Sequence, residues 1–235
     1  MSTASRPLSA VDRLFFPLLG VTTCSVVAAG FARTYYLGFW FHAPPLTTMV
    51  HVHAAAFTAW LVLLSSQLLL IRVGRFRWHR ALGKAAVALV GVMVVTGYIV
   101  IFGKPRPTAF TRAFIFTPIL SLVLFPIFFG LAIRFRRDPG THKRLMILAT
   151  ILIANAGVAR LLGILGIGAA PYGSWIATYA LLLVPLMAFD LTRLGTLDRA
   201  TAWGTLALLA RHPLHAAIAY TDQWQRLAAW LTPPV

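Results

Sequence analysis

Residues 46–71 read LTTMVHVHAAAFTAWLVLLSSQLLLI and contain no Asp, Glu, Lys or Arg. After a short basic stretch come residues 82–102, LGKAAVALVGVMVVTGYIVIF, whose only charged residue is Lys84. An apolar run of about 18 or more residues is long enough to cross the hydrocarbon core of a bilayer as an α-helix. The two stretches therefore predict two membrane-spanning helices joined by a short turn.

The same pattern recurs along the whole chain. Of its residues, 59% are hydrophobic and 11% charged, and the mean hydropathy is +0.80, whereas a soluble domain carries roughly 25% charged residues. We expect an all-α integral membrane bundle that forms a single domain over residues 1–235, with six to seven transmembrane helices. The expected helices cover residues 14–36, 46–71, 82–102, 113–133, 144–168, 174–192 and 200–220.

The first and last of these stretches need separate interpretation. Residues 14–36 exceed the apolar region of a signal peptide, which has roughly 7–15 residues, so we expect an uncleaved helix there. Residues 200–220 are interrupted by Arg211, His212 and Pro213. This stretch either spans the membrane or lies at its surface as an amphipathic helix.

The net charge is +16, from 21 Lys and Arg against 5 Asp and Glu. The basic residues cluster at 72–84 and 134–144, between apolar stretches, as the positive-inside rule describes for cytoplasmic loops. This distribution predicts a cytoplasmic N-terminus and an external loop at 37–46. It also argues against nucleic-acid binding, which requires a basic face on a water-exposed domain.

Residue content excludes several classes of chemistry. Cys24 is the only cysteine, so no internal disulfide or thiolate metal cluster can form. The sequence contains no Gly-rich phosphate loop, His-Glu-x-x-His motif or nucleophile elbow. Five acidic residues are too few for a carboxylate-rich di-iron site. Asp190 and Arg193, three residues apart, are expected to pair.

Polar groups inside a bilayer are costly, which makes them the first candidates for function. His53, Trp60 and Gln67 share one face of the helix expected at 46–71, because they are spaced at seven-residue intervals. We therefore expect His53 to point inward, while His51 points roughly the other way. The alternative is that both histidines are polar residues at the membrane interface.

Arg160 is a charged residue within the helix expected at 144–168. His142 lies five turns earlier on the same face, at ~3.6 residues per turn. An arginine near the bilayer centre costs roughly 2.5–3.5 kcal/mol, so Arg160 must find an anion, carbonyl groups or a ligand. Otherwise its side chain extends to the membrane surface. Tyr98 and Asn155 are candidate hydrogen-bonding groups in the same half of the membrane.

His79 and His142 each precede an apolar stretch on the basic side of the membrane. Two histidines at matched depth on different helices are the basic geometry of a bis-imidazole haem site, or half of a metal site. Alternatively, both are interfacial residues among lipid-binding Arg and Lys. His212 and His215 lie at i and i+3, and one of them could pair with His53 if 200–220 spans the membrane.

The strings His51-Val-His53, His79-Arg-Ala-Leu-Gly83 and His142-Lys-Arg-Leu-Met146 resemble an uncharacterised family of bacterial multi-pass membrane proteins. The resemblance implies a location in the bacterial inner membrane. There is a looser similarity to cytochrome b561-like proteins, which use histidine pairs on helices to hold haem, and it implies pairing of His79 with His142. Residues 113–133 contain no histidine to partner His53, which departs from a two-haem pattern.

The sequence therefore favours a redox protein, surrounded by membrane lipids, that binds haem b or a His-bound transition metal. Its partner would be a quinone or another lipophilic molecule. His79 and His142 would be the cofactor ligands, and His53 a ligand or proton relay that His212 could accompany. Arg160 would hold an anionic group of the cofactor or ligand.

Two other functions remain open. A non-enzymatic transporter or lipophilic-ligand-binding protein would use a pocket formed by Gln67, Tyr98, Asn155 and Arg160. A membrane hydroxylase or hydrolase with a His-bound metal would need at least three histidines on one side of the membrane. On the basic side, His79 and His142 supply two.

Overall fold

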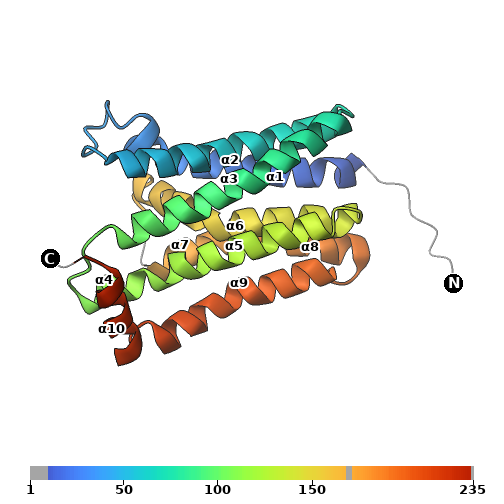
Figure 1. The fold of residues 1–235 in the computed structure, drawn as a ribbon. Coiled ribbons are helices and arrows are strands. Elements are labelled where there is room, and N and C mark those ends of the chain that lie inside the picture. Colours follow the sequence, from blue (N-terminus) through green and yellow to red (C-terminus); the bar gives the residue numbers. More distant parts are fainter. Residues whose placement is uncertain (1–9, 168–170, 234–235) are drawn as a thin grey trace.

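The computed structural model describes residues 10–167 and 171–233, which form a bundle of helices lying side by side (Figure 1). The helices long and apolar enough to cross a membrane are Leu14–Tyr36, Thr48–Arg72, Phe76–Phe102, Ala109–Arg134, Pro139–Ile164 and Gly173–Leu194. They correspond to the first six stretches expected from the sequence, so the predicted all-α membrane bundle is confirmed. Residue 168, the expected end of the fifth stretch, lies outside the described residues.

Every regular element of the described residues is a helix, and two short elements, η1 and η2, are π-helical. In chain order the elements are α1 (Ala10–Phe31), η1 (Ala32–Tyr36), α2 (Thr48–Arg72), α3 (Phe76–Phe102), α4 (Ala109–Phe114), α5 (Phe116–Arg134), α6 (Pro139–Ile164), α7 (Pro171–Thr178), η2 (Tyr179–Leu183), α8 (Val184–Leu194), α9 (Arg199–Ile218) and α10 (Asp222–Leu231). The π-turns lie within the first and sixth membrane passes.

Three connections, two that contain arginines and one flanked by Arg193 and Arg199, lie at the same end of the bundle. The turns at 73–75, 135–138 and 195–198 all lie there, at the right of Figure 1, where α1 also begins. Lys143 of α6 lies 4.0 Å from the centroid of the Phe16 ring of α1, which brings the starts of these two helices together. We call this the basic end, and the other the opposite end.

α6 is the central helix of the bundle. It contacts α1, α5, α7 and α9, and most of its side chains between Arg144 and Val158 are buried. It crosses α1 at Gly30 and Gly157, where a Cβ on Gly30 would lie 2.0 Å from the Gly157 carbonyl oxygen. Small residues at such crossings allow two membrane helices to pack backbone against backbone.

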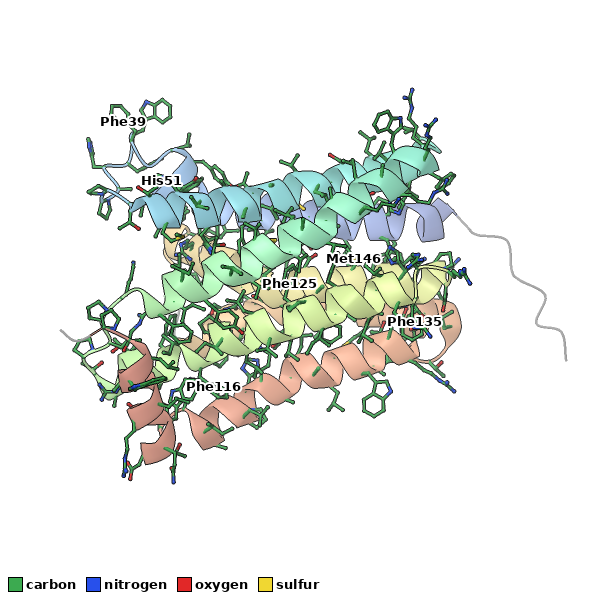
Figure 2. All side chains as sticks on the ribbon, in the orientation of Figure 1. Phe39, His51, Phe116, Phe125, Phe135 and Met146 are labelled. Atoms are coloured by element: carbon green, nitrogen blue, oxygen red, sulfur yellow. The ribbon has the colours of Figure 1, made fainter. Side chains whose placement is uncertain are left out.

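Aromatic side chains fill the core beside α6. Trp60 of α2 is fully buried and packs edge-on against Phe125 and Phe129 of α5, with ring centroids 5.1 and 5.8 Å away. Figure 2 shows Phe125 in the middle of the bundle. Met93 of α3 is fully buried in the same cluster. This apolar layer separates the polar groups of the basic end from those of the opposite end.

The outside of the bundle is apolar. Many large hydrophobic side chains are exposed there, among them Leu18, Val62, Leu69, Val95, Ile127, Ile176 and Leu206. A water-exposed surface would be covered with charges instead, so these faces contact membrane lipid.

α9 runs along the bundle beside α5 and α6 (Figure 1). Its 20 residues span about 30 Å at 1.5 Å per residue. It is absent from the six strongly apolar helices because its buried face is polar, with Thr201, Thr205, Arg211 and His215. The structure shows α9 lying lengthwise beside α5 and α6, and the two alternatives for residues 200–220 stay predictions. Helix α10, which the sequence did not predict, packs against α4 at the opposite end.

Several helices begin earlier than the sequence predicts, and the largest differences are at α3 and α6. α3 begins at Phe76 rather than 82, and α6 begins at Pro139 rather than 144. Hydropathy marks only the part of a helix that lies in the membrane, and both helices extend beyond that part into the basic end. For α6 the start is set by Asp138, whose carboxylate accepts the N–H groups of Gly140 and Thr141.

Candidate functional site

His79 and His142 face each other at the basic end. Each lies in the first turns of its helix, α3 or α6, and their ring centroids are 6.5 Å apart with the ring planes at 89°. The sequence predicted two histidines at matched depth, and the structure brings these two side chains together. Both rings are partly shielded from solvent.

The hydrogen bonds of the two rings leave nitrogen atoms free to bind a ligand. His142 Nδ1 lies 2.8 Å from the Ala132 carbonyl oxygen. Because a carbonyl oxygen only accepts, Nδ1 carries the hydrogen and Nε2 of the neutral ring keeps its lone pair. Metal-bound histidines commonly donate their second nitrogen in this way. His79 Nδ1 is buried and has no hydrogen-bond partner among the described residues.

Gln67 of α2 adjoins this pair. Its Nε2 donates to the carbonyl oxygen of His79 at 3.1 Å, while its Oε1 is buried without a partner in the described part of the chain. The sequence placed Gln67 in a pocket with Tyr98, Asn155 and Arg160, but the structure places it at the basic end. The Gln67 side chain therefore adds a buried, unpaired oxygen close to the backbone of His79.

The spacing of the two rings fits a shared metal. With metal–nitrogen bonds of ~2.0–2.1 Å, two imidazoles on opposite sides of one ion have ring centroids about 6 Å apart, close to the observed 6.5 Å. In residues 10–167 and 171–233, no three His, Cys, Asp or Glu side chains come together. The hydroxylase or hydrolase alternative therefore lacks a third histidine in the part of the chain described.

Exposed arginines surround the histidine pair. They come from the turns that precede α3 and α6 and from the first turns of α3: Arg75, Arg77, Arg80, Arg136 and Arg137. Such a surface suits the propionates of a haem as well as the phosphates of lipids.

The histidines of the opposite end do not form a second pair. His53 Nδ1 lies 3.4 Å from Thr96 Oγ1 of α3, and its ring stacks at 4.3 Å on Phe57. His212 instead lies 2.9 Å from the Tyr179 hydroxyl, on the α7–α9 side of the bundle. The contacts of the described residues therefore keep His53 and His212 in separate surroundings.

The remaining predicted pocket residues are also dispersed. Arg160 is exposed, donates to the Ala156 carbonyl oxygen and lies 4.4 Å from the Phe31 ring centroid. Asn155 faces α7, where its amide bonds to Thr178. Tyr98 stacks on Phe102 of its own helix, with centroids 6.0 Å apart. The described contacts of these three side chains do not assemble a common pocket.

Sequence reasoning missed Arg211 as a candidate. Its side chain is 3% exposed, in the half of α9 toward the opposite end, and its Nη2 donates to Ser121 Oγ at 2.7 Å. The signal that could have identified it was a charged residue inside residues 200–220, a stretch long enough to cross a membrane. Because neighbouring His212 and Pro213 also suggested an interfacial helix, the sequence left the position of this charge open.

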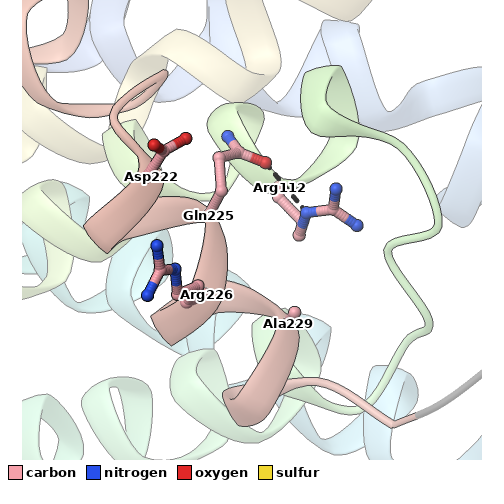
Figure 3. Close-up of a pocket in the computed structure, with 5 residues that line it drawn as sticks. All are labelled: Arg112, Asp222, Gln225, Arg226 and Ala229. Atoms are coloured by element: carbon pink, nitrogen blue, oxygen red, sulfur yellow. Dashed lines mark hydrogen bonds between the residues drawn. The ribbon is translucent and has the colours of Figure 1, made fainter.

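A surface pocket of about 420 Å³ lies between α4 and α10 (Figure 3). Arg112 Nε donates to Gln225 Oε1 at 2.8 Å, and the Gln225 amide nitrogen donates to the carbonyl oxygens of Ala109 and Ala219. Trp224 Nε1 donates to the Arg112 carbonyl oxygen at 2.9 Å. These bonds hold α10 across the end of the bundle, and we assign this pocket a structural role.

Comparison with known proteins gives no information on function, so the proposal below rests on the geometry of the site residues. No protein-family model matches the chain, and no curated protein or solved structure matches it either.

Proposed function

We propose that the chain is a membrane-embedded redox protein in which His79 and His142 hold one haem b or one transition-metal ion. The observation that carries this proposal is the adjacent pair of imidazoles, whose ring centroids lie 6.5 Å apart with the ring planes at 89°, and the engagement of His142 Nδ1 by a carbonyl oxygen. A quinone or another lipophilic molecule is the proposed electron-transfer partner, because the faces of the bundle contact lipid.

Each side chain of this site has a distinct task. His79 and His142 would supply the two ligand nitrogens from separate helices. The Ala132 carbonyl oxygen holds the His142 ring in one tautomer, which leaves Nε2 free to bind. Gln67 holds the backbone of His79 and so sets the height of its ring. A bound haem or redox-active metal would supply the one-electron chemistry.

We further propose a location in a bacterial inner membrane, with the basic end in the cytoplasm. The turns at 73–75 and 135–138 contain arginines, and the turn at 195–198 is flanked by Arg193 and Arg199; all three lie at one end of the bundle, as the positive-inside rule describes. In a Cys24→Ser background, Gly74→Cys should react with an impermeant maleimide only after the cells are opened. A cysteine at His42, in the 37–47 loop, should react in intact cells. The reverse labelling pattern would overturn the orientation.

The cofactor proposal is tested on protein purified from cells supplied with haem and iron. We expect a Soret band that shifts on reduction, or stoichiometric transition metal by elemental analysis. His79→Ala and His142→Ala should each lose most of the bound cofactor. His51→Ala, which changes an exposed histidine of α2, is the matched control and should bind as the wild type.

Two results would contradict the proposal. The first is wild-type protein that is monodisperse and colourless and holds no stoichiometric metal. The second is a cofactor content that His79→Ala and His142→Ala leave unchanged, because the ligands would then lie elsewhere.

A further inference from the structure

Arg211 is a buried cation that no acidic side chain in the described part of the chain neutralises. Its side chain is 3% exposed, and its Nε has no hydrogen-bond partner among the described residues. None of the four acidic side chains that the structure describes forms an ion pair with it. A guanidinium stays charged in a protein, so its positive charge persists within the bundle.

The one described hydrogen bond of this guanidinium goes to a neutral group. Nη2 donates to Ser121 Oγ of α5, and that hydroxyl in turn donates to the Thr117 carbonyl oxygen at 2.9 Å. A hydroxyl can accept this hydrogen bond but carries no negative charge. Since a buried charge without a counter-ion is strongly destabilising, Arg211 requires an anion.

Further unpaired polar atoms lie one helical turn nearer the opposite end. On α9, His215 follows Arg211 by one turn, is 9% exposed and has a buried Nδ1 without a partner in the described chain. On α5, Thr117 precedes Ser121 by one turn and has a buried Oγ1 that is likewise unpaired. The two helices run in opposite directions (Figure 1). His215 and Thr117 therefore lie one turn beyond Arg211 and Ser121 along the same interface between α5 and α9.

Aromatic rings surround these polar atoms. Phe116, Trp175 and Tyr220 lie with ring centroids 5.8 to 6.0 Å from that of His215. Trp224 of α10 packs edge-on against Phe116 at 4.9 Å. These rings provide apolar contacts between the buried charge and the surface of the membrane. A ligand here would therefore combine an anionic head with an apolar body.

We infer that Arg211 and Ser121 bind the head group of a lipophilic monoanion, with one carboxylate or phosphodiester on an apolar chain. One guanidinium balances one negative charge, and the other polar members, Thr117 and His215, carry no fixed charge. Guanidinium groups hold carboxylate and phosphate oxygens through paired N–H donors. The unpaired Nε is the second donor of such a pair.

This inference is independent of the proposed redox function. The Arg211 cluster lies between α5 and α9 in the half of the bundle toward the opposite end, whereas His79 and His142 lie at the basic end. A result at one site therefore leaves the other unaffected.

The test uses radiolabelled dodecanoate and the full chain in a non-ionic detergent at pH 8. We expect saturable binding near one molecule per chain and a raised thermal unfolding temperature. Dodecanol, which has the same chain without the charge, should produce neither effect. Phosphatidylglycerol should compete if phospholipid is a source of the anion, whereas phosphatidylcholine should not. Competition by inorganic phosphate as strong as that by unlabelled dodecanoate would overturn the proposal.

Variants separate a binding role from a structural one. Arg211→Met should weaken dodecanoate binding at least tenfold, while the ligand-free protein stays as stable as the wild type or becomes more stable, because an unpaired buried charge is removed. Arg211→Lys keeps the charge and tests folding independently; it should retain partial binding. Arg160→Met removes an exposed arginine and should bind as the wild type. Wild-type binding by Arg211→Met would overturn the proposal.

Discussion

Arg144 and Asp190 form a buried ion pair that joins α6 to α8 at the basic end. Arg144 Nε donates to Asp190 Oδ1 at 3.0 Å and to Oδ2 at 3.2 Å, and the two residues are 5% and 0% exposed. The same carboxylate accepts the backbone N–H of Asp198, which caps α9. One carboxylate thus connects three helices beside the turn that carries His142.

Removal of either partner of this pair should be costly. We expect Arg144→Met to lower the free energy of unfolding by about 3–5 kcal/mol, because it leaves the Asp190 carboxylate buried without a cation. Asp190→Ala should also lower it, because the one ion pair that Arg144 then keeps in the described part of the chain is with Asp198, whose Oδ1 lies 3.8 Å from Arg144 Nε. The double variant should lose less than the sum of the two, since both charges are gone. Unfolding titrations in mixed micelles measure all three. Additive losses would show that the two side chains act separately.

This ion pair illustrates what the sequence could not predict. Asp190 and Arg193 were expected to pair because they are three residues apart on one helix. The structure shows that the carboxylate binds Arg144, 46 residues earlier in the chain. With many arginines at the basic end, no local pattern identifies the one that a distant carboxylate will meet.

The membrane passes were predictable because the cost of crossing a bilayer acts on each helix separately. Helix α9 was ambiguous for the same reason, since a polar face lowers hydropathy whether it contacts water or another helix. Contacts of α9 with α5 and α6 decide between these two cases. Such contacts depend on helices that are distant in sequence.

The candidate site residues were also predictable only in part, because the sequence gives their depth in the membrane better than it gives their neighbours. Sequence position gives the depth of a residue in the membrane, and both His79 and His142 begin helices at the same end. Depth does not give the direction in which a side chain points. Arg160 and Asn155 are five residues apart on α6, yet one faces Phe31 of α1 and the other faces α7. Five residues turn an α-helix by about 140° beyond one full turn, so the two side chains lie on different faces of α6.

The crossing of α1 and α6 should tolerate no side chain larger than a hydrogen atom. A Cβ on Gly157 would lie 2.7 Å from Val27 Cα, a backbone atom that cannot move alone. We expect Gly157→Ala to lower the free energy of unfolding by at least the roughly 1–3 kcal/mol typical of overpacking. The measurement is the same unfolding titration.

Gly91, in the middle of α3, provides the matched control for this prediction. A Cβ at this position meets nothing within 4 Å. Gly91→Ala should therefore leave stability unchanged or raise it by up to about 1 kcal/mol, through the better helix propensity of alanine. Equal effects of the two substitutions would mean that the close crossing is not what Gly157 provides.

The carboxylate of Asp138 should make the start of α6 sensitive to acid. The Thr141 hydroxyl and the N–H groups of Thr141 and Gly140 hold the pKa of Asp138 below its ordinary value. Because the pKa is lower in the folded protein, the stabilisation is complete above the unfolded-state pKa of about 3.9 and is lost as the pH falls through the folded-state pKa. Asp138→Ala should cost about 1 kcal/mol at pH 7 and progressively less below about pH 4. Asp138→Asn should cap the helix without this pH dependence. Thermal unfolding between pH 3 and pH 7 measures both, and a cost of Asp138→Ala that is constant with pH would contradict the prediction.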